Sequence, residues 1–491
     1  MLHGVVLLDA ISIGQQFQKV VLLLKNVVVV KNNDRRACLV YLKTYILMEQ
    51  EVKTVVRKSI PLDKIFALPS KMVNIRYANK ILVVSPETAN WIVLQNEEQL
   101  SFLNLLHNNQ LGEALQHFSG SHQNAQAVVT QIIARKFENK KVHFKHETGT
   151  MQFYLTNGCN MRCPHCYMFA GIKKNNELST DEVYSVLDKF YNSGGKVIVF
   201  SGGEIALRKD LLQIIEHSYN LGIKNEILTN GTLWTEETIS KIAPMLSRVQ
   251  ISIDGYSEET NSKVRGKGNF SKALQTVESF LKYHVYTEIS VTPYLDKNLE
   301  VDYPKYVEFA KNLYQNYGDI NFLVKFTFDI LEGRNIVVTN EQKKIYQAIV
   351  TEIYDGIYGD FMDKPFINFH KNGGLEDNCD YGNLAISADG NVVLCPILQQ
   401  MKSIGNVRSD DFTSILTLAK KARELADVNN LTPCKECELK YICGGDCRVK
   451  YFDGFKECNL KMMENANREC SLGNKEYFYD MMIRLNEKMF Q

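Results

Sequence analysis

The sequence predicts an α/β protein whose centre is an open, partial barrel of six strand–helix units, with a small N-terminal module and a cysteine-rich C-terminal region. Three observations lead to this prediction. From Met151 onward, short β-rich runs alternate with longer amphipathic stretches. Before them, three apolar runs precede three short helical segments. Eleven of the twelve cysteines form two groups, three within eight residues and eight from Cys379 onward.

The bulk composition indicates a globular, multidomain chain. With 491 residues, 45% of them apolar, it can form roughly two to four domains with cores of their own. Lysine and arginine (57) balance aspartate and glutamate (56), so the net charge of +1 predicts no nucleic-acid partner and no membrane partner. The most apolar stretch, residues 4–30, contains Asp9, Lys19 and Lys25, and neither a membrane span nor a secretion signal is expected. We therefore expect a soluble, cytoplasmic protein in which clustered cysteines bind metal.

Six strands are expected at the start of six consecutive strand–helix units. They are the runs MQFYLT from Met151, KVIVF from Lys196, EILT from Glu226, RVQISI from Arg248, EISVT from Glu288 and NFLVKFTF from Asn321. The capping residues Ser179 and Thr180 precede the first helix. A closed barrel would need eight units, so an open barrel over residues 148–335 fits better. Ligands of such sheets bind beyond the carboxyl ends of the strands, where the polar motifs of this region lie.

The N-terminal module is expected at residues 71–140. The runs MVNIRYA, ILVVS and NWIVL predict a small antiparallel meander that turns at residues 78–80, and the helical segments that follow are 97–107, 112–118 and 123–137. Three strands with three short helices suggest a winged-helix-like module, although a plain structural cap on the barrel has the same pattern. Residues 1–70 have poor periodicity and remain unassigned, and the isolated Cys38 is expected to be a small buried hydrophobe.

After the barrel, a helical pattern leads into a region whose sequence periodicity is weak. A helical pattern over 340–357 lies in a linker, residues 336–369. From residue 370 to the end at 491, glycine, asparagine and cysteine are frequent and periodicity fades. A fold held together by metal ligation rather than by a core is expected to have such a sequence.

The first cysteine group has the spacing of an iron–sulfur site. Cys159, Cys163 and Cys166 lie in one tight loop directly after the first strand. A Cys-x3-Cys-x2-Cys loop can bind three irons of a cubane cluster and leave the fourth iron open to another ligand. Structural zinc is the alternative, but it generally needs four ligands, and the nearest candidate, His165, lies inside the loop.

Polar motifs follow the next three strands. The second strand runs into Ser201-Gly202-Gly203-Glu204, the third into Asn230-Gly231, and the fourth into Ser252 and Asp254, with Arg265 after them. Two adjacent glycines let the backbone approach a ligand closely, and a carboxylate accepts hydrogen bonds. Asn-Gly and Asp-Gly are also common turn dipeptides, so Asn230 and Asp254 could serve only to form turns.

These motifs together resemble the radical S-adenosylmethionine (SAM) superfamily. The resemblance implies that the open iron chelates SAM and that reductive cleavage yields a 5′-deoxyadenosyl radical, with the electron supplied by a donor such as flavodoxin or ferredoxin. It also implies that the 201–204 segment binds the methionyl ammonium, whereas Ser252 and Arg265 contact the ribose and the carboxylate of SAM. His165, Asn230 and Asp254 complete the expected cofactor-binding set.

The second cysteine group contains enough thiols for two further clusters. Its spacing resembles the SPASM extension of radical SAM enzymes, which carries two auxiliary 4Fe–4S clusters. The resemblance assigns Cys379, Cys395 and Cys447 to the first auxiliary cluster, and assigns to the second Cys434, Cys437, Cys443 and Cys470. Cys458 could replace Cys470 or be a free thiol. No cysteine precedes Cys379 closely, so a substrate thiolate, His370 or Asp380 could complete the first auxiliary cluster. Two structural zinc sites of four cysteines are the alternative.

The family resemblance predicts a peptide-modifying oxidoreductase. Radical SAM/SPASM enzymes mostly modify peptides, and the N-terminal module resembles the recognition element of maturases of ribosomally made peptides, in which a leader peptide adds a strand to a sheet edge. The expected product is a thioether, carbon–carbon or ether cross-link, or a related oxidation, in a precursor peptide. An anaerobic sulfatase-maturing enzyme is the runner-up, but Pro396 stands where that family has an acidic base. A non-catalytic iron–sulfur protein would leave the strand-end motifs unexplained.

Overall fold

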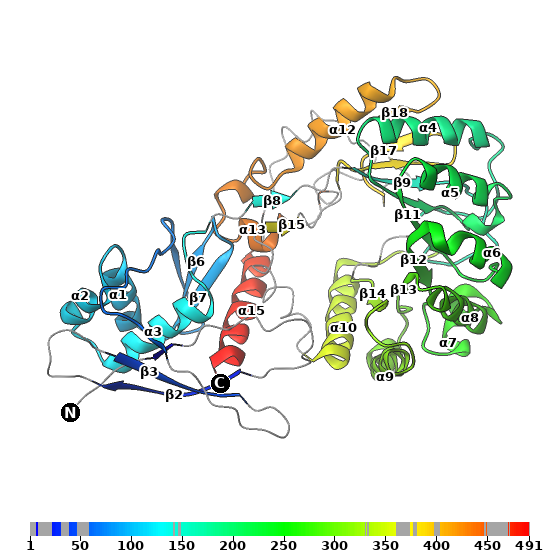
Figure 1. The fold of residues 1–491 in the computed structure, drawn as a ribbon. Coiled ribbons are helices and arrows are strands. Elements are labelled where there is room, and N and C mark those ends of the chain that lie inside the picture. The colour runs from blue at the N-terminus through cyan, green and yellow to red at the C-terminus, as the bar shows by residue number, and fades with distance from the viewer. Residues whose placement is uncertain are drawn as a thin grey trace.

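The structure is a computed structural model of the 491-residue chain. It describes residues 6–7, 22–30, 39–46, 58–140, 143–145, 149–328, 330, 333–359, 374–376, 381–396, 403–445, 448, 470 and 472–490, of which those before residue 60 are described as backbone only. The N-terminal module and the barrel lie at opposite ends of the molecule, and the C-terminal helix α15 (Leu472–Phe490) lies between them (Figure 1).

Six parallel strands form the centre of the barrel, as predicted. They are β9 (Thr150–Tyr154), β10 (Val197–Ser201), β11 (Lys224–Thr229), β12 (Leu246–Ser252), β13 (Tyr286–Val291) and β14 (Phe322–Phe326). Each strand pairs in parallel with the next one along the chain. The row of strands ends at β14 without closing on itself, so the prediction of an open, six-unit barrel is confirmed.

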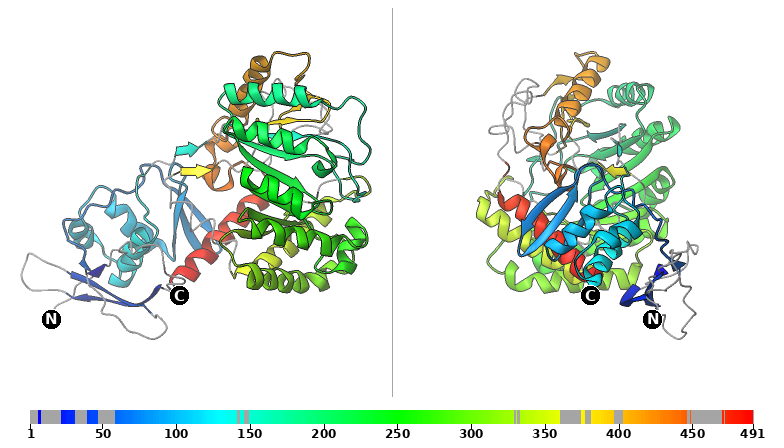
Figure 2. Two further views of the ribbon diagram at one scale, coloured as in Figure 1. Left: turned by 45° about the vertical axis from the view of Figure 1, so that its right-hand side comes forward. Right: turned by 90° about the vertical axis from the view of Figure 1, so that its left-hand side faces the viewer.

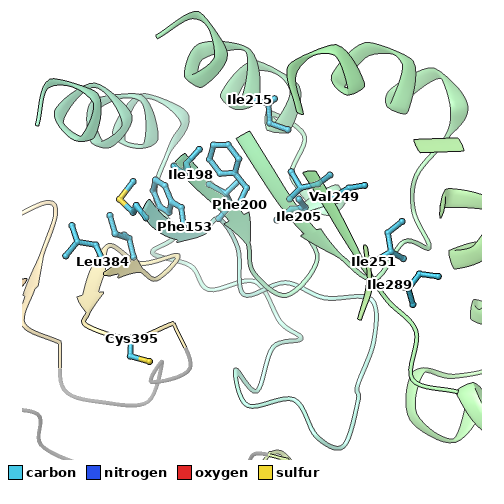
Figure 3. Close-up of a cluster of buried hydrophobic side chains, with 14 of the residues drawn as sticks. Phe153, Ile198, Phe200, Ile205, Ile215, Val249, Ile251, Ile289, Leu384 and Cys395 are labelled. Atoms are coloured by element: carbon cyan, nitrogen blue, oxygen red, sulfur yellow. The ribbon is translucent and has the colours of Figure 1, made fainter. Parts of the chain in front are cut away.

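Helices cover the outer face of this sheet (Figure 2). They are α4 (Thr180–Asn192), α5 (Leu211–Asn220), α6 (Glu236–Ile242), α7 (Glu258–Arg265), α8 (Asn269–Lys282), α9 (Leu299–Tyr317) and α10 (Asn340–Tyr358), with 3-10 turns η1 (Ile205–Leu207) and η2 (Ala243–Met245). Ser179 caps the N-terminus of α4 with a capping box. The Ser179 hydroxyl accepts from the Glu182 N–H, and the Glu182 carboxylate accepts from the Ser179 N–H. Phe153, Phe200 and Ile215 are among the buried residues between sheet and helices (Figure 3).

The C-terminal region extends the sheet, which the sequence did not predict. Strand β16 (Leu384–Ile386) pairs in parallel with β9, and β17 (Asn391–Val393) and β18 (Gly405–Asn406) follow in antiparallel order. The complete sheet therefore has nine strands. Leu384 of β16 pairs with Met151 of β9, and Leu384, Phe153 and Cys395 belong to the same buried cluster (Figure 3).

The N-terminal module has the three strands and three helices that were predicted. The strands β5 (Val73–Tyr77), β6 (Lys80–Ser85) and β7 (Asn90–Leu94) form an antiparallel sheet, and the helices are α1 (Glu97–Leu106), α2 (Leu111–His117) and α3 (His122–Ala134). Ala78 and Asn79 connect β5 to β6 with positive φ angles of 47° and 58°, as a two-residue hairpin turn requires. Ile60, Phe66 and Leu68, which precede the expected boundary at residue 71, are also buried in the core of this module.

Regular elements occur after residue 370 although the sequence periodicity is weak there. The region contains α12 (Phe412–Ala426), η3 (Cys434–Glu436), α13 (Lys440–Cys443) and α15. Met482 and Leu485 of α15 pack with Trp91 and Val93 of β7 in one buried cluster, which also contains Leu439 near the second cysteine group. The N-terminal module therefore shares a core with the C-terminal region rather than capping the barrel alone.

Short strand pairs complete the description. Strand β1 (Val6–Leu7) pairs with β4 (Lys58–Ser59), β2 (Leu22–Val30) with β3 (Leu39–Ile46), and β8 (His143–Lys145) with β15 (Gly374–Glu376). The first two pairs are antiparallel and the third is parallel. Among the described helices, none has both the length and the apolar character needed to cross a membrane.

Candidate active site

The loop after β9 brings the first three cysteines to the carboxyl end of the sheet. Cys163 is buried, and Cys159 and Cys166 are partly buried. Burial raises the pKa of the Cys159 thiol, and Glu204 and the other two cysteines add to this effect. Burial also raises the pKa of Cys163, although the Arg265 guanidinium opposes it. Three neighbouring thiols in such surroundings become thiolates when a metal cation compensates their charge.

The Ser201-Gly202-Gly203-Glu204 turn is hydrogen-bonded directly to this cluster loop. The Gly203 N–H donates to the Thr156 carbonyl and the Glu204 N–H to the Gly158 carbonyl, both at 2.8 Å. A Cβ atom on Gly203 would lie 2.2 Å from the Gly158 carbonyl oxygen, so only glycine permits this approach. The cluster loop after β9 and the 201–204 turn after β10 are therefore in direct contact.

Glu204 is a buried acceptor at the end of β10. Its side chain is 1% exposed, and it accepts hydrogen bonds from the Thr229 hydroxyl and the Asn230 N–H, both at 2.7 Å. Burial raises the pKa of Glu204, while these hydrogen bonds favour its carboxylate form. Asn230 also donates to the Asn160 side chain of the cluster loop at 2.8 Å and accepts from the Thr232 N–H. Asn230 is therefore a turn former and a contact to the cluster loop at once.

Asp254, Arg265 and His165 form a second polar group beside the cysteines. Oδ2 of Asp254 lies 2.6 Å from Nε of Arg265 and 3.5 Å from Nε2 of His165. Oδ1 of Asp254 accepts from the Thr292 N–H at 3.0 Å, which fixes the carboxylate on β12's carboxyl end. Burial lowers the pKa of His165, with Asp254 opposing, so the neutral ring is favoured. Ser252, the last residue of β12, is half-buried two residues before Asp254.

The Asp254–Arg265 pair is buried beside the cysteines. Oδ2 of Asp254 and Nε of Arg265 contact each other at 2.6 Å, so each atom is the ion-pair partner of the other. The site therefore combines the Arg265 guanidinium beside three thiols, the fixed Asp254 carboxylate and the glycine backbone of the 201–204 turn. These groups fit an iron–sulfur cluster together with a ligand that has amino and carboxylate groups.

A segment that the sequence did not indicate holds the cluster loop in place. Gly333, after β14, lies so close to the backbone of His165 that a Cβ there would be 2.4 Å from the His165 carbonyl carbon. The Asn335 N–H donates to the Pro164 carbonyl at 2.9 Å. The Arg334 guanidinium donates to the carbonyls of Cys163 (3.5 Å) and Ala170. We call residues 333–335 the clamp.

Two tyrosines connect the cluster loop with Cys395. The Tyr154 hydroxyl at the end of β9 donates to the Pro396 carbonyl at 2.6 Å and lies 3.4 Å from the Tyr167 hydroxyl. Tyr167 follows Cys166 in the chain, and Pro396 follows Cys395. Burial raises the pKa of Tyr167, and both cysteines contribute to the shift, as expected if the phenol lies between them. No sequence pattern indicated a role for Tyr154, since it is one of several apolar or aromatic residues of β9.

The predicted ligands of the second auxiliary cluster line one cavity. Its volume is about 250 Å³, and the cysteines in its wall are Cys434, Cys437, Cys443 and Cys470. Burial raises the pKa of the Cys437 thiol to about 11. Within the described part of the chain, no group of three or more His, Cys, Asp or Glu residues is arranged to hold a single metal ion. Cys379, Cys447 and Cys458, like Cys38, His370 and Asp380, lie outside the described residues.

Comparison with known proteins agrees with this geometry. Residues 153–309 match the radical SAM superfamily, and residues 379–438 match the SPASM iron–sulfur cluster-binding domain. The chain contains a radical SAM domain and a SPASM domain. It is a radical SAM enzyme whose cofactors are 4Fe–4S iron–sulfur clusters and SAM.

Relatives of the enzyme have different named activities. The AdoMet-dependent heme synthase of Methanosarcina barkeri is 29% identical over 61% of this chain and 90% of its own length. The mycofactocin maturase MftC of Mycolicibacterium smegmatis is 28% identical over 61% of this chain and 78% of its own. The solved structure of native anSMEcpe with bound AdoMet shares the fold, with a TM-score of 0.52 and 20% identity over 70% of this chain and 99% of that one.

The clamp leads to a testable prediction for the radical SAM site. Arg334→Ala removes charged hydrogen bonds to the cluster loop, each worth about 1.5–3 kcal/mol when well formed, so the loop is expected to loosen and 5′-deoxyadenosine formation to fall about tenfold. Iron loss to a chelator, followed by absorbance, is expected to become faster, whereas Arg334→Lys should recover part of the effect. The exposed Lys173→Ala in the same loop is the control. Unchanged iron loss in Arg334→Ala would contradict a holding role for the clamp.

Proposed function

We propose that this enzyme is a maturase of a ribosomal precursor peptide. It would use the radical made from SAM to abstract hydrogen from the peptide and would form a thioether, carbon–carbon or ether cross-link, or a related oxidation. The observation that carries the proposal is the shared core of the N-terminal module and the C-terminal region. Trp91 and Val93 of the module pack with Leu439 and Ile442, which lie beside the cysteines of the second auxiliary cavity. A peptide bound to the module would thus be held at a fixed position relative to the auxiliary site.

We assign the cofactor ligands as follows. Cys159, Cys163 and Cys166 hold the SAM-binding cluster. The 201–204 turn, Asn230, Ser252, Asp254, Arg265 and His165 position SAM. The four cysteines of the cavity hold the second auxiliary cluster, and Cys395 holds the first, with Cys379 and Cys447 as its expected partners. Cluster-bound SAM supplies the 5′-deoxyadenosyl radical on one-electron reduction, for which we propose flavodoxin or ferredoxin as the donor.

In this proposal the residues named above bind and orient SAM and the clusters, and they do not themselves react. Asp254 holds the Arg265 guanidinium beside Cys163, and this places a positive charge where the carboxylate of SAM would lie. Glu204, fixed by Thr229 and Asn230, keeps the end of β10 in the shape in which its backbone and carboxylate can accept the methionyl ammonium. Tyr154 holds the backbone after Cys395 against the cluster loop, which sets the position of the first auxiliary site relative to the radical.

We propose that the chain is divided into four functional units. We propose a recognition module from about residue 60 to residue 140, a radical SAM barrel over 148–335, a linker helix α10 within 336–369 and a SPASM region over 370–491. The first of these boundaries follows the buried residues Ile60 and Phe66 rather than the sequence pattern.

Coexpression with the precursor tests the proposed function. The candidate substrate is the product of any short open reading frame found beside the gene of this enzyme. Mass spectrometry of that peptide is expected to show the loss of two hydrogens, or of multiples of two, relative to the peptide made with the Cys163→Ala enzyme. The same cells should be examined for porphyrin products, because a relative is named as a heme synthase. An unchanged peptide mass together with a new porphyrin would overturn the maturase proposal in favour of that second function.

A further inference from the structure

The wall of the second auxiliary cavity contains an ion pair in addition to its four cysteines. Glu438 follows Cys437 in the chain, Lys475 comes from α15, and both side chains line the cavity. Nζ of Lys475 lies 2.8 Å from one carboxylate oxygen of Glu438 and 3.0 Å from the other. The exposed fraction is 30% for the Lys475 side chain and 13% for that of Glu438, so water and salt screen this pair less than a pair on the open surface.

Helix α15 fixes the position of the pair. Tyr479, one turn after Lys475, is buried and donates its hydroxyl to the Glu438 carboxylate. The Tyr479 ring lies 5.4 Å from the ring of Tyr77 of β5, and Tyr479 belongs to the buried cluster that joins the N-terminal module to the C-terminal region. Glu438 is therefore held by two donors from one packed helix, which fixes where both charges lie.

The Glu438 carboxylate lies beside the sulfur of an expected cluster ligand. Its Oε2 atom is 3.7 Å from Sγ of Cys437. The Leu439 N–H donates to the same sulfur, with a distance of 3.4 Å between the nitrogen and Sγ. A carboxylate next to a thiolate is unfavourable because the two negative charges repel each other, and a cation that binds the carboxylate relieves this repulsion. Lys475 supplies that cation.

The charged side chains of the described cavity wall balance one another. They are Glu436, Glu438, Lys440 and Lys475. Nζ of Lys440 lies over the Tyr441 ring, 4.7 Å from its centroid, whereas Lys475 contacts the carboxylate that approaches the cysteine sulfur. Loss of Lys475 alone would leave an excess of negative charge in the wall. Loss of Glu438 alone would leave an excess of positive charge.

This charge balance matters for a cluster whose own charge changes. A 4Fe–4S cluster with four thiolate ligands becomes more negative by one charge when it accepts an electron, and its reduction potential depends on the net charge and on hydrogen bonds to its sulfur atoms. A neighbouring cation favours the reduced state, and a neighbouring carboxylate disfavours it. Lys475 and Glu438 therefore act on the potential in opposite directions.

We infer that Lys475 raises the reduction potential of the second auxiliary cluster by compensating the charge of Glu438, and so makes this cluster a better electron acceptor. The inference rests on the proposed function, in which the four cysteines of the cavity hold that cluster. It adds two residues that are not ligands, one of which lies on the helix that packs against the N-terminal module.

Redox titration of paired variants tests this inference. Full-length enzyme with the Cys163→Ala substitution, which removes the SAM-binding cluster, should be reconstituted without oxygen and titrated with dithionite in the presence of redox mediators. The signal of the second auxiliary cluster in electron paramagnetic resonance is the one that Cys437→Ala abolishes. At the midpoint potential of the Cys163→Ala parent, we expect Lys475→Met to lower the ratio of reduced to oxidised cluster about tenfold, which is about 59 mV for one electron.

The companion variants have expected results that a purely structural role would not give. Glu438→Gln should raise the ratio, and Lys475→Arg, which keeps the charge, should leave it close to the parent value. Lys475→Met combined with Glu438→Gln should return the ratio close to that of the parent, because the wall is then balanced again. Lys420→Met removes an exposed lysine of α12 that does not line the cavity, and it should leave the ratio unchanged.

The direction of the shifts and the iron content decide the outcome. Iron should be measured before each titration. If Lys475→Met and Lys475→Gln both lose the iron of the second auxiliary cluster, the pair holds the cavity together and the inference is overturned. A shift in the same direction for Lys475→Met and Glu438→Gln, or no shift at full iron content, also overturns it.

The same titration separates this inference from the maturase function, since it contains no peptide. The expected shifts together with an unmodified precursor in the coexpression experiment would support the inference and reject only the maturase function. If Cys437→Ala abolishes no signal, the proposed ligand assignment of the cavity fails, and the inference fails with it.

Discussion

Replacement of Cys163 by alanine is expected to reduce 5′-deoxyadenosine formation to background. Cys163 is one of three loop cysteines, and each is expected to bind a different iron, so the remaining two cannot retain a cluster that binds SAM. The variant should be purified and reconstituted without oxygen, and its iron content and product should be measured by colorimetry and by chromatography with mass detection. Iron is expected to fall by about one cluster, or four irons, per chain.

Cys437→Ala is the matched control for this loss. Cys437 lines the second auxiliary cavity, which is distinct from the cluster loop, and its replacement should also remove iron. The radical SAM site should remain intact, so 5′-deoxyadenosine formation is expected to persist while modification of the peptide is lost. Production of 5′-deoxyadenosine by Cys163→Ala at the rate of the unmodified enzyme would contradict the assignment of the loop.

Gly203→Ala is expected to abolish SAM binding while leaving most of the fold intact. The added Cβ would lie 2.2 Å from the Gly158 carbonyl oxygen, and contact with backbone cannot be relieved by a rotamer change. The 201–204 turn and the cluster loop must therefore separate, and the hydrogen bonds between them would be lost. We expect a loss of stability of about 1–3 kcal/mol, and at least about a hundredfold weaker SAM binding by equilibrium dialysis.

Gly222→Ala distinguishes this clash from ordinary glycine strain. Gly222 has a φ of +87°, but a Cβ there would have no atom within 4 Å. Its replacement should cost only the strain of a left-handed residue, about 1 kcal/mol, and should leave SAM binding unchanged. Equal SAM affinity in Gly203→Ala and the unmodified enzyme would show that the contact between the two motifs is not needed for binding.

The sequence predicted those parts of the fold that have a local pattern. The six barrel strands are short β-rich runs, each of which precedes an amphipathic helix, and β10 is the continuous apolar run that is typical of a parallel strand buried on both faces. Strands β16, β17 and β18 contain only two or three residues each, too few for any periodicity. Helix α15 was missed because its buried face contacts β6 and β7, about 400 residues earlier in the chain, and such a partner leaves no local signal.

In the candidate site, too, residues with a local sequence pattern were predicted and residues defined by distant contacts were not. Cysteine spacing and strand-end motifs identified the residues around the cluster loop, and the structure brings Glu204, Asn230, Asp254 and Arg265 to the same end of the sheet. The clamp could not be found, since Arg334 meets Cys163 across 171 residues of sequence. Tyr154 was equally hidden, because its partner Pro396 lies 242 residues away. Contacts of this range are set by packing of the whole barrel and not by any pattern in either segment.

The shared core also changes how the N-terminal module should be tested. Deletion of residues 1–140 would remove Leu82, Trp91 and Val93 and would expose Met482 and Leu485 of α15 to water. Such exposure of apolar surface is unfavourable by about 25 cal/mol per Å² and would disturb the neighbouring auxiliary cavity. Weak peptide modification by the truncated enzyme would therefore not by itself prove a role in recognition. Substitutions of exposed residues of the module, such as Asn74 of β5, avoid this difficulty.

Isotope transfer from substrate to cofactor is the most direct test of the central claim. The precursor peptide should be made with fully deuterated amino acids and incubated with reconstituted enzyme, SAM and reductant, and the mass of the 5′-deoxyadenosine should be measured. Hydrogen abstraction from the peptide predicts that 5′-deoxyadenosine gains one deuterium in step with the loss of deuterium from the peptide. If 5′-deoxyadenosine carries no deuterium although the peptide is bound, the peptide is not the substrate of the radical and the account is contradicted.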